Sequence, residues 1–124
     1  MAMQTHILVV EDDKLVSEVV VDALEGLYET SRAETAAAAL ERLRAGGIDA
    51  MLLDCTLPGG LDPHLVPTAD QSGVPVILMS GHPYMVERVP GARPFILKPF
   101  SLSALLATIE RVVPAAAPAR VAAG

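Results

Sequence analysis

Short apolar runs recur along this chain and are separated by longer segments of mixed polarity. The runs at 7–10, 51–53, 76–79 and 95–97 have no polar interruption. A short continuous apolar run is typical of a strand that is buried on both faces of a parallel sheet. Including the residues that flank them, we predict five strands: Ile7–Val10, Tyr28–Ala33, Ile48–Asp54, Val74–Met79 and Arg93–Leu97. The second is the most polar of the five, because it contains Glu29, Ser31 and Arg32.

The segments between these strands have the spacing of amphipathic helices. After the first strand, apolar residues fall on one helical face, and four charged residues, Lys14, Glu18, Asp22 and Glu25, fall on the other. The residues expected to face inward are Leu15, Val16, Val19, Val20, Ala23, Leu24 and Leu27. A second helix is expected from an N-cap at Thr35 to Ala45, ending at Gly46 and Gly47, and a third from about Leu61 to Gln71. A last helix follows an N-cap at Ser101, with Leu102, Leu105, Leu106, Ile109 and Val113 facing inward.

Alternation of strand and helix predicts an α/β fold with a doubly wound, five-stranded parallel sheet. Right-handed crossovers favour the flavodoxin-like strand order 2-1-3-4-5. The fourth helix must fit between His82 and Gly91, a segment that contains Pro83 and Pro90, so we expect it to be shortened. Residues 1–113 would form this one domain, and the Ala- and Pro-rich tail at 114–124 is expected to be disordered.

Composition narrows the class of protein. The length of 124 residues, with 52% hydrophobic and 19% charged residues, suits one globular domain. A net charge of −6 argues against nucleic-acid binding, and no apolar stretch is long enough for a membrane span. The lone Cys55 and the absence of a recognisable signal peptide favour a cytoplasmic location.

Polar residues that could bind a ligand or take part in a reaction lie at the ends of four of the predicted strands. Glu11 and Asp12 follow the first, Asp54 ends the third, Ser80 follows the fourth and Lys98 follows the fifth. The carboxyl ends of parallel strands meet at one edge of the sheet, which is where ligands bind in such folds. Three carboxylates there require a cation, and a hydroxyl with an ammonium beside them suggests a phosphoryl group.

Each of these features also has a simpler interpretation. The acidic residues 11–13 could be a cluster favoured by a helix dipole, and Asp54 could be a turn residue before Pro58. Ser80 with Gly81 is a common turn dipeptide, and Lys98 could sit at an exposed strand end. Their joint occurrence at consecutive strand ends is what favours a shared site.

The chain reads ILVVEDD, LLDCTLPGG, VILMSG and FILKPF at these four strand ends. These segments resemble the signature blocks of the receiver domain of bacterial two-component response regulators, and the likeness runs from about His6 to Val113. The resemblance implies that Asp54 is the phosphoacceptor for a sensor histidine kinase or a histidine phosphotransfer protein. It further implies Mg²⁺ as cofactor, bound by Asp12, by Asp54, by the backbone carbonyl of Thr56 and, largely through water, by Glu11.

The resemblance also assigns a switch. Ser80 would be the switch hydroxyl, Lys98 the ammonium that senses the phosphoryl group, and Phe95 the aromatic that turns inward. A cis peptide is implied between Lys98 and Pro99. Because the segments from Asp54 to Ser80 and from Ser80 to Lys98 are shorter than is usual in receivers, the usual roles of the fourth-helix face are in doubt. We expect a stand-alone receiver that signals by binding an unknown downstream protein or by relaying phosphate, and that is not a turnover enzyme.

Three other interpretations are less well supported by the sequence. A phosphatase of the haloacid dehalogenase type would need its nucleophile and a second Asp two residues later, at the first strand, which residues 10–13 do not supply. A flavodoxin-like carrier would need a phosphate-binding loop where Glu11 and Asp12 stand. A degenerate receiver would keep the fold and act as a phosphorylation-independent docking protein.

Overall fold

The fold is known from a computed structural model that describes residues 5–57, 62–89 and 91–113. Strands and helices alternate through these ranges. In chain order they are β1 (His6–Val10), α1 (Lys14–Leu24), β2 (Glu29–Ala33), α2 (Ala36–Ala45), β3 (Ala50–Asp54), α3 (Leu65–Gln71), β4 (Val76–Ser80), α4 (Pro83–Val86), β5 (Phe95–Leu97) and α5 (Leu102–Val112). The strands pair in parallel in the order β2-β1-β3-β4-β5, which confirms the predicted topology.

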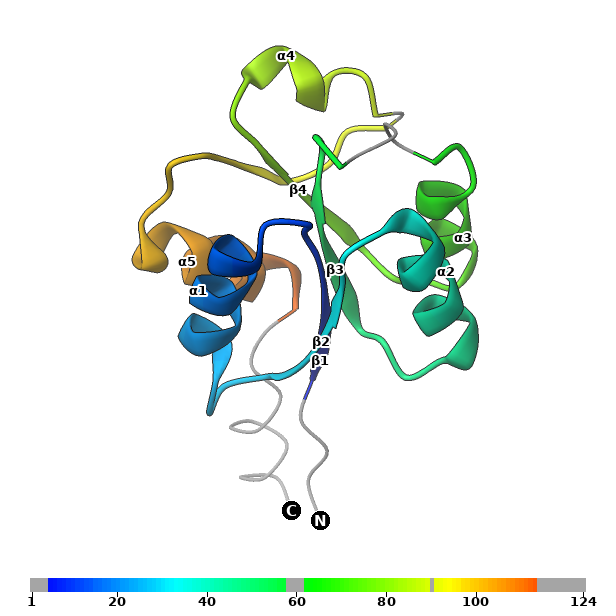
Figure 1. Cartoon of the computed structure of the whole chain (residues 1–124), viewed down its shortest axis with the longest axis horizontal. Helices are drawn as coiled ribbons and strands as arrows, with labels where there is room; N and C mark the ends of the chain where they lie inside the picture. The colour runs from blue at the N-terminus through cyan, green and yellow to red at the C-terminus, as the bar shows by residue number, and fades with distance from the viewer. Residues whose placement is uncertain (1–4, 58–61, 90, 114–124) are drawn as a thin grey trace.

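Helices cover both faces of the sheet. Figure 1 shows α1 and α5 on one face, α2 and α3 on the other, and α4 beyond the ends of the strands. Successive side chains of a strand point to opposite faces, so Leu8 and Val10 pack on the α2 side while Ile7 and Val9 pack on the α1 side. This arrangement explains why β1, β3 and β4 are apolar without alternation.

Three helices begin at a side chain that caps the first turn. The Thr35 hydroxyl accepts a hydrogen bond from the amide of Ala38, and the Ser101 hydroxyl accepts one from the amide of Ala104, so both predicted N-caps are confirmed. Asp13 caps α1 by accepting hydrogen bonds from the amides of Leu15 and Val16. These caps fix the points at which the chain turns from the carboxyl ends of the strands into the helices.

The inward face of α1 was only partly predicted. Val20 and Leu24 are buried, but the side chains of Leu15 and Val19 are 74% and 51% exposed. Leu27 and, at the start of α5, Leu102 are also exposed. Helical periodicity shows that these residues share a broad apolar face, whereas only the part that contacts the sheet is covered. The outer part of that face remains on the surface.

Two segments depart from the expected boundaries. The third helix begins at Leu65, later than the expected start near Leu61, which lies outside the described residues. Pro63 keeps the helix from extending back through Asp62, because proline disfavours a helical backbone at the residue before it. The fourth helix is limited to Pro83–Val86, and it contains no buried residue. Val89, three residues beyond it, is only 3% exposed and anchors the segment to the core.

Three further predictions concern the tail, membrane spans and one peptide bond. The expected disordered tail at 114–124 lies outside the described residues. Among the helices that the structure describes, none is both long and apolar enough to cross a membrane. The peptide bond between Lys98 and Pro99 is cis, as the sequence resemblance implied.

Candidate functional site

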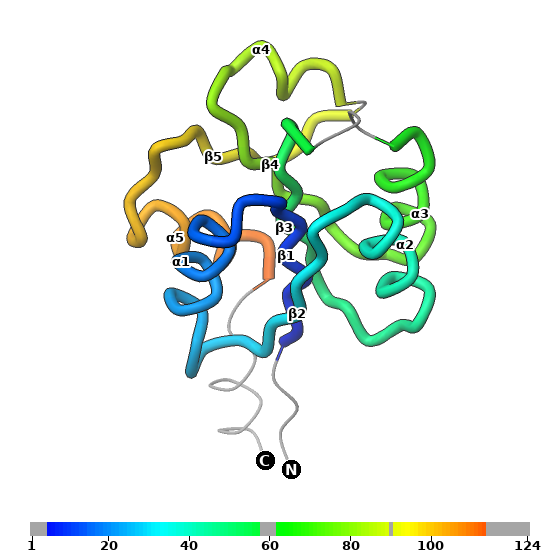
Figure 2. Tube along the Cα trace, viewed as in Figure 1, coloured from blue at the N-terminus to red at the C-terminus, as the bar shows by residue number. Residues whose placement is uncertain are grey.

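The predicted site residues gather at one edge of the sheet. In Figure 2 the chain leaves β1, β3 and β4 at the same edge, the one that faces α4. Pairing of Val10 with Leu53 and of Asp54 with Met79 places the ends of these three strands side by side. The topology therefore brings together residues that are far apart in the sequence.

Three carboxylates form the centre of this group. One carboxylate oxygen from each of Glu11, Asp12 and Asp54 lies within 4.8 Å of the others. Glu11 and Asp54 are 2% and 1% exposed, while Asp12 is open to solvent. The cluster is therefore closed on the side of Glu11 and Asp54 and open to solvent on the side of Asp12.

Lys98 reaches this cluster from the end of β5. Its Nζ lies 2.8 Å from Oε1 of Glu11 and 3.5 Å from Oδ2 of Asp54. The Lys98 amide also donates to the carbonyl of Ser80, which fixes the loop that carries the ammonium. The sequence placed Lys98 beside Asp54, but its shorter contact is with Glu11.

The carboxylate of Asp54 is held by its own loop. The amide of Thr56 donates to Oδ1 of Asp54 at 2.9 Å, and the Thr56 hydroxyl donates to the same oxygen at 2.8 Å. Burial alone would raise the pKa of Asp54, but hydrogen bonds from Glu11 and Thr56 and the charge of Lys98 outweigh it. The pKa of Asp54 therefore lies below its usual value, and the group is ionised at neutral pH.

The crowding of carboxylates mainly affects the pKa of Glu11. Burial and the neighbouring Asp54 raise the pKa of Glu11 to about 7, against the opposing effects of Lys98 and of the Asp13 amide. Near neutral pH the metal-free site thus holds a proton on Glu11 for part of the time. One ammonium is not enough to balance three carboxylates, so the donor set fits a further cation with a preference for oxygen ligands.

Ser80 ends β4, and Phe95 begins the neighbouring strand β5. The buried Ser80 hydroxyl donates to the carbonyl of His82 at 2.8 Å and accepts from the His82 amide at 3.0 Å. Phe95 is paired with Leu78, yet its side chain is 47% exposed. The hydroxyl is therefore engaged by the loop before α4, and the aromatic ring points outward.

Some features of the site were not predicted from the sequence. Thr56 was expected to contribute only its backbone carbonyl, but its side-chain hydroxyl donates a hydrogen bond directly to Asp54. A hydroxyl residue two positions after a strand-ending carboxylate is the signal that could have indicated it. Cys55 is buried, and burial raises the pKa of its thiol to about 11, so it is a poor nucleophile.

Comparison with known proteins identifies the family. The family model for the response regulator receiver domain matches residues 7–110. The transcriptional regulatory protein CseB of Streptomyces coelicolor is 38% identical over 120 residues, covering 91% of this chain and 51% of that protein. The phosphate regulon transcriptional regulatory protein PhoB of Escherichia coli K12 is 33% identical over 120 residues, covering 90% of this chain and 52% of PhoB. This chain thus spans about half the length of these curated relatives.

Solved structures agree with this result. The chemotaxis protein CheY4 of Vibrio cholerae superposes with a TM-score of 0.78 at 25% identity, covering 90% of this chain and 100% of CheY4. The BeF3-activated conformation of SdrG from Pseudomonas melonis Fr1 gives a TM-score of 0.73 at 32% identity, covering 88% of this chain and 98% of SdrG. Fold, strand order, sequence and the cluster at the strand ends all agree, and the chain belongs to the response regulator receiver domain family of two-component systems.

Proposed function

We propose that this domain accepts a phosphoryl group on Asp54 from the phosphohistidine of a sensor kinase or a histidine phosphotransfer protein. The observation that carries the proposal is the ionised, buried Asp54 carboxylate with Lys98 3.5 Å from its Oδ2 atom. A carboxylate must be ionised to act as a nucleophile, and its charge must be balanced before an anionic phosphoryl group can approach. Membership of the receiver family supports the same assignment.

The chemistry is a transfer between two side chains. A bond forms between a carboxylate oxygen of Asp54 and phosphorus, while the bond from phosphorus to the donor's imidazole nitrogen breaks. Oδ1 of Asp54 already accepts two hydrogen bonds from Thr56, so Oδ2 is the oxygen with more freedom to attack. Lys98 would then leave Glu11 to contact a phosphoryl oxygen, since its ammonium is held near both carboxylates.

The cation of this site is proposed to be Mg²⁺. Glu11, Asp12 and Asp54 supply hard oxygen ligands, and the exposure of Asp12 leaves room for the water molecules that Mg²⁺ retains. Bound there, Mg²⁺ would neutralise charge on the phosphoryl oxygens during transfer. The backbone carbonyl of Thr56 is proposed as a further ligand, on the family resemblance.

Ser80 and Phe95 are proposed to convert phosphorylation into a change of shape. The Ser80 hydroxyl would exchange its bonds with His82 for a bond to the phosphoryl group, and the ring of Phe95 would turn into the space that Ser80 leaves. Both residues flank α4, so the resulting change is delivered to an exposed surface that a downstream protein could bind.

The experiment that tests the proposal is incubation with a small phosphodonor and Mg²⁺, followed by intact-mass measurement. We expect the protein to gain the mass of one phosphoryl group, and to lose it on treatment with hydroxylamine, which cleaves acyl phosphates. A parallel sample with a chelator should gain nothing. A degenerate receiver that only docks would show no mass increase in any sample.

Mg²⁺ is expected to raise the melting temperature of the protein, because a ligand that binds only the folded state stabilises it. Asp12→Ala should abolish this increase, since Asp12 is the solvent-facing member of the carboxylate cluster. Asp22→Ala is the matched control, because Asp22 is an exposed carboxylate on α1 away from the cluster. An equal Mg²⁺ response in the Asp12 variant and the wild type would disprove the assignment.

The segment around α4 is expected to exchange its amide hydrogens quickly and to respond to phosphorylation. A helix of four residues with no buried side chain has little to stabilise it, whereas β4 is buried throughout. Hydrogen exchange should show weak protection at Tyr84 and Val86 and strong protection at Ile77, with a change at the first two when a phosphoryl mimic and Mg²⁺ are added. Strong, unchanged protection at Tyr84 and Val86 would mean that the signal leaves through another surface.

A further inference from the structure

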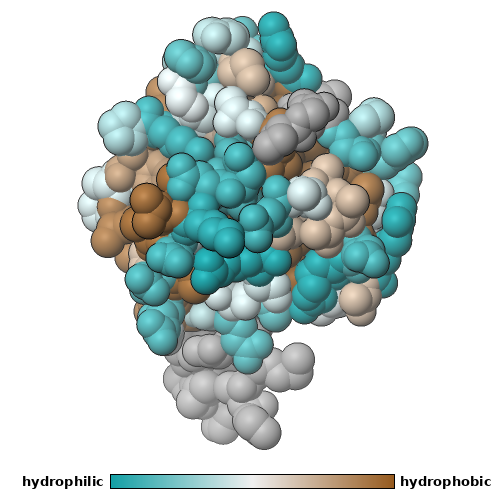
Figure 3. Space-filling view, viewed as in Figure 1, coloured by the Kyte–Doolittle hydropathy of each residue, from teal (hydrophilic) through white to brown (hydrophobic). Residues whose placement is uncertain are grey.

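A cavity lies on the opposite side of β1 from Asp54. Its volume is about 780 Å³, and it is bounded by α1, by the end of β2 and by the start of α2. Figure 3 shows hydrophilic side chains gathered over this part of the surface, between α1 and α2. Its lining includes five charged residues and one serine: Glu11, Lys14, Ser17, Glu18, Arg32 and Glu34.

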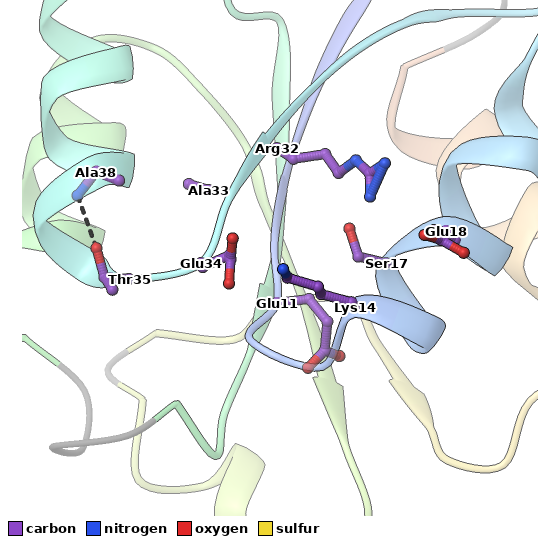
Figure 4. A pocket seen from close by; sticks show the side chains of 9 residues that line it. All are labelled: Glu11, Lys14, Ser17, Glu18, Arg32, Ala33, Glu34, Thr35 and Ala38. Carbon is purple, nitrogen blue, oxygen red and sulfur yellow. Dashed lines mark hydrogen bonds between the residues drawn. The ribbon is translucent and has the colours of Figure 1, made fainter.

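Ser17 gives the clearest sign that this cavity accepts a ligand. The residue is 3% exposed, and its Oγ atom is the one buried side-chain polar atom of the described residues that has no hydrogen-bond partner. Figure 4 shows this hydroxyl directed from α1 into the space below the Arg32 side chain. A buried hydroxyl without a partner is costly, so a group that bonds to it would remove that cost.

Two cationic side chains face the same space. Lys14 extends from the first turn of α1 and Arg32 from β2, and both are directed into the cavity in Figure 4. Across the ranges that the structure describes, the ion pairs involve His6, Arg93 and Lys98 but neither Lys14 nor Arg32. The amino end of the ten-residue helix α2 opens onto the cavity through Thr35 and Ala38, which adds a partial positive charge.

The acidic residues of the lining restrict what can bind. The Glu11 carboxylate is held by Lys98 and by the Asp13 amide, and Figure 4 shows it turned away from Ser17 and Arg32. Glu18 and Glu34 are exposed and remain as acceptors for hydroxyl groups. The lining contains no aromatic side chain, so a nucleobase would have nothing to stack on. A highly charged anion would also be repelled by the two glutamates.

We propose that this cavity binds a small hydroxylated phosphomonoester, such as a sugar or polyol phosphate. Arg32, Lys14 and the Ser17 hydroxyl hold the phosphate, and Glu18 and Glu34 accept hydrogen bonds from the hydroxyls of the ligand. Arg32 supplies the planar fork of donors that suits a phosphate. Glu11 belongs both to the lining of this cavity and to the carboxylate cluster, so the cavity is a direct neighbour of the Asp54 site.

The test is a titration followed by amide chemical shifts in metal-free buffer, with glycerol 3-phosphate, inorganic phosphate and glycerol as the probes. We expect saturable shifts around Ser17 and Arg32, with glycerol 3-phosphate binding more tightly than phosphate and glycerol not binding. Arg32→Gln should weaken binding about tenfold or more, as the loss of a charge-assisted hydrogen bond does. Arg111→Gln, which removes an exposed arginine from α5, should leave affinity unchanged.

A second variant separates ligand binding from structure. Ser17→Ala should weaken binding without lowering the melting temperature, because the hydroxyl has no partner to lose. The proposal is overturned if none of the probes gives saturable shifts, if Arg32→Gln binds as the wild type does, or if glycerol binds as tightly as glycerol 3-phosphate. A fall in melting temperature with unchanged affinity in the Ser17 variant would likewise show that the hydroxyl is structural.

Discussion

Lys98→Met is expected to destabilise the metal-free protein by about 2–3 kcal/mol at alkaline pH, because it removes one partner of a buried ion pair. The Lys98 ammonium lies 2.8 Å from Oε1 of Glu11, a side chain that is 1% exposed, and 3.5 Å from Oδ2 of Asp54. Methionine keeps the length of the side chain but leaves both carboxylates without a cation. Denaturant unfolding gives the free energy directly.

The loss should depend on pH. In the wild type the pKa of Glu11 is already raised to about 7, and removing Lys98 would raise it further. The same change would also raise the pKa of Asp54, because the charge of Lys98 helps to hold that pKa below its usual value. A carboxyl with a higher pKa in the folded than in the unfolded state binds more protons when folded, so stability falls as pH rises. We therefore expect a larger loss at about pH 8 than at about pH 5.5, where Glu11 carries a proton.

Lys14→Met is the matched control, since Lys14 is the other lysine of the chain and forms no ion pair in the described structure. It should change the free energy of unfolding by less than about 0.5 kcal/mol at either pH. Equal losses in the two lysine variants, or a Lys98 loss that is larger at the lower pH, would contradict the proposed balance of charges.

The sheet was predictable because several features of the sequence indicate it independently. Continuous apolar runs identified β1, β3 and β4, and the order of strands followed from the handedness of their connections. The polar β2 was also predicted. Its polarity is explained by its position at the edge of the sheet, where it pairs only with β1 in the observed order. The site residues then came together as a consequence of that order.

Other features depended on packing that a sequence pattern does not contain. Leu15 and Val19 fit the apolar face of α1, yet both remain largely exposed within the part of the chain that the structure describes. The choice of Glu11 over Asp54 as the nearer partner of Lys98 depends on side-chain positions at the ends of β1 and β5. The unpartnered hydroxyl of Ser17 was likewise invisible in the sequence, where it is one polar residue among the valines of a buried helix face.

Asp54→Asn is expected to abolish phosphorylation completely. The amide is nearly the same size as the carboxylate, so it fits the hydrogen bonds at Thr56, but it is not a nucleophile. Glu11 is a poor substitute, because burial keeps its pKa near 7 and Lys98 holds its carboxylate, and Asp12 is exposed at the rim. We therefore expect phosphorylation to be lost without a comparable loss of stability.

The most direct test of the central claim is the intact mass of this variant after treatment with a small phosphodonor and Mg²⁺. The wild type and Asp22→Asn, which changes an exposed carboxylate on α1, should each gain one phosphoryl mass, and Asp54→Asn should gain none. Circular dichroism should confirm that all three are folded. If a folded Asp54→Asn protein gains the phosphoryl mass at the rate of the wild type, Asp54 is not the acceptor.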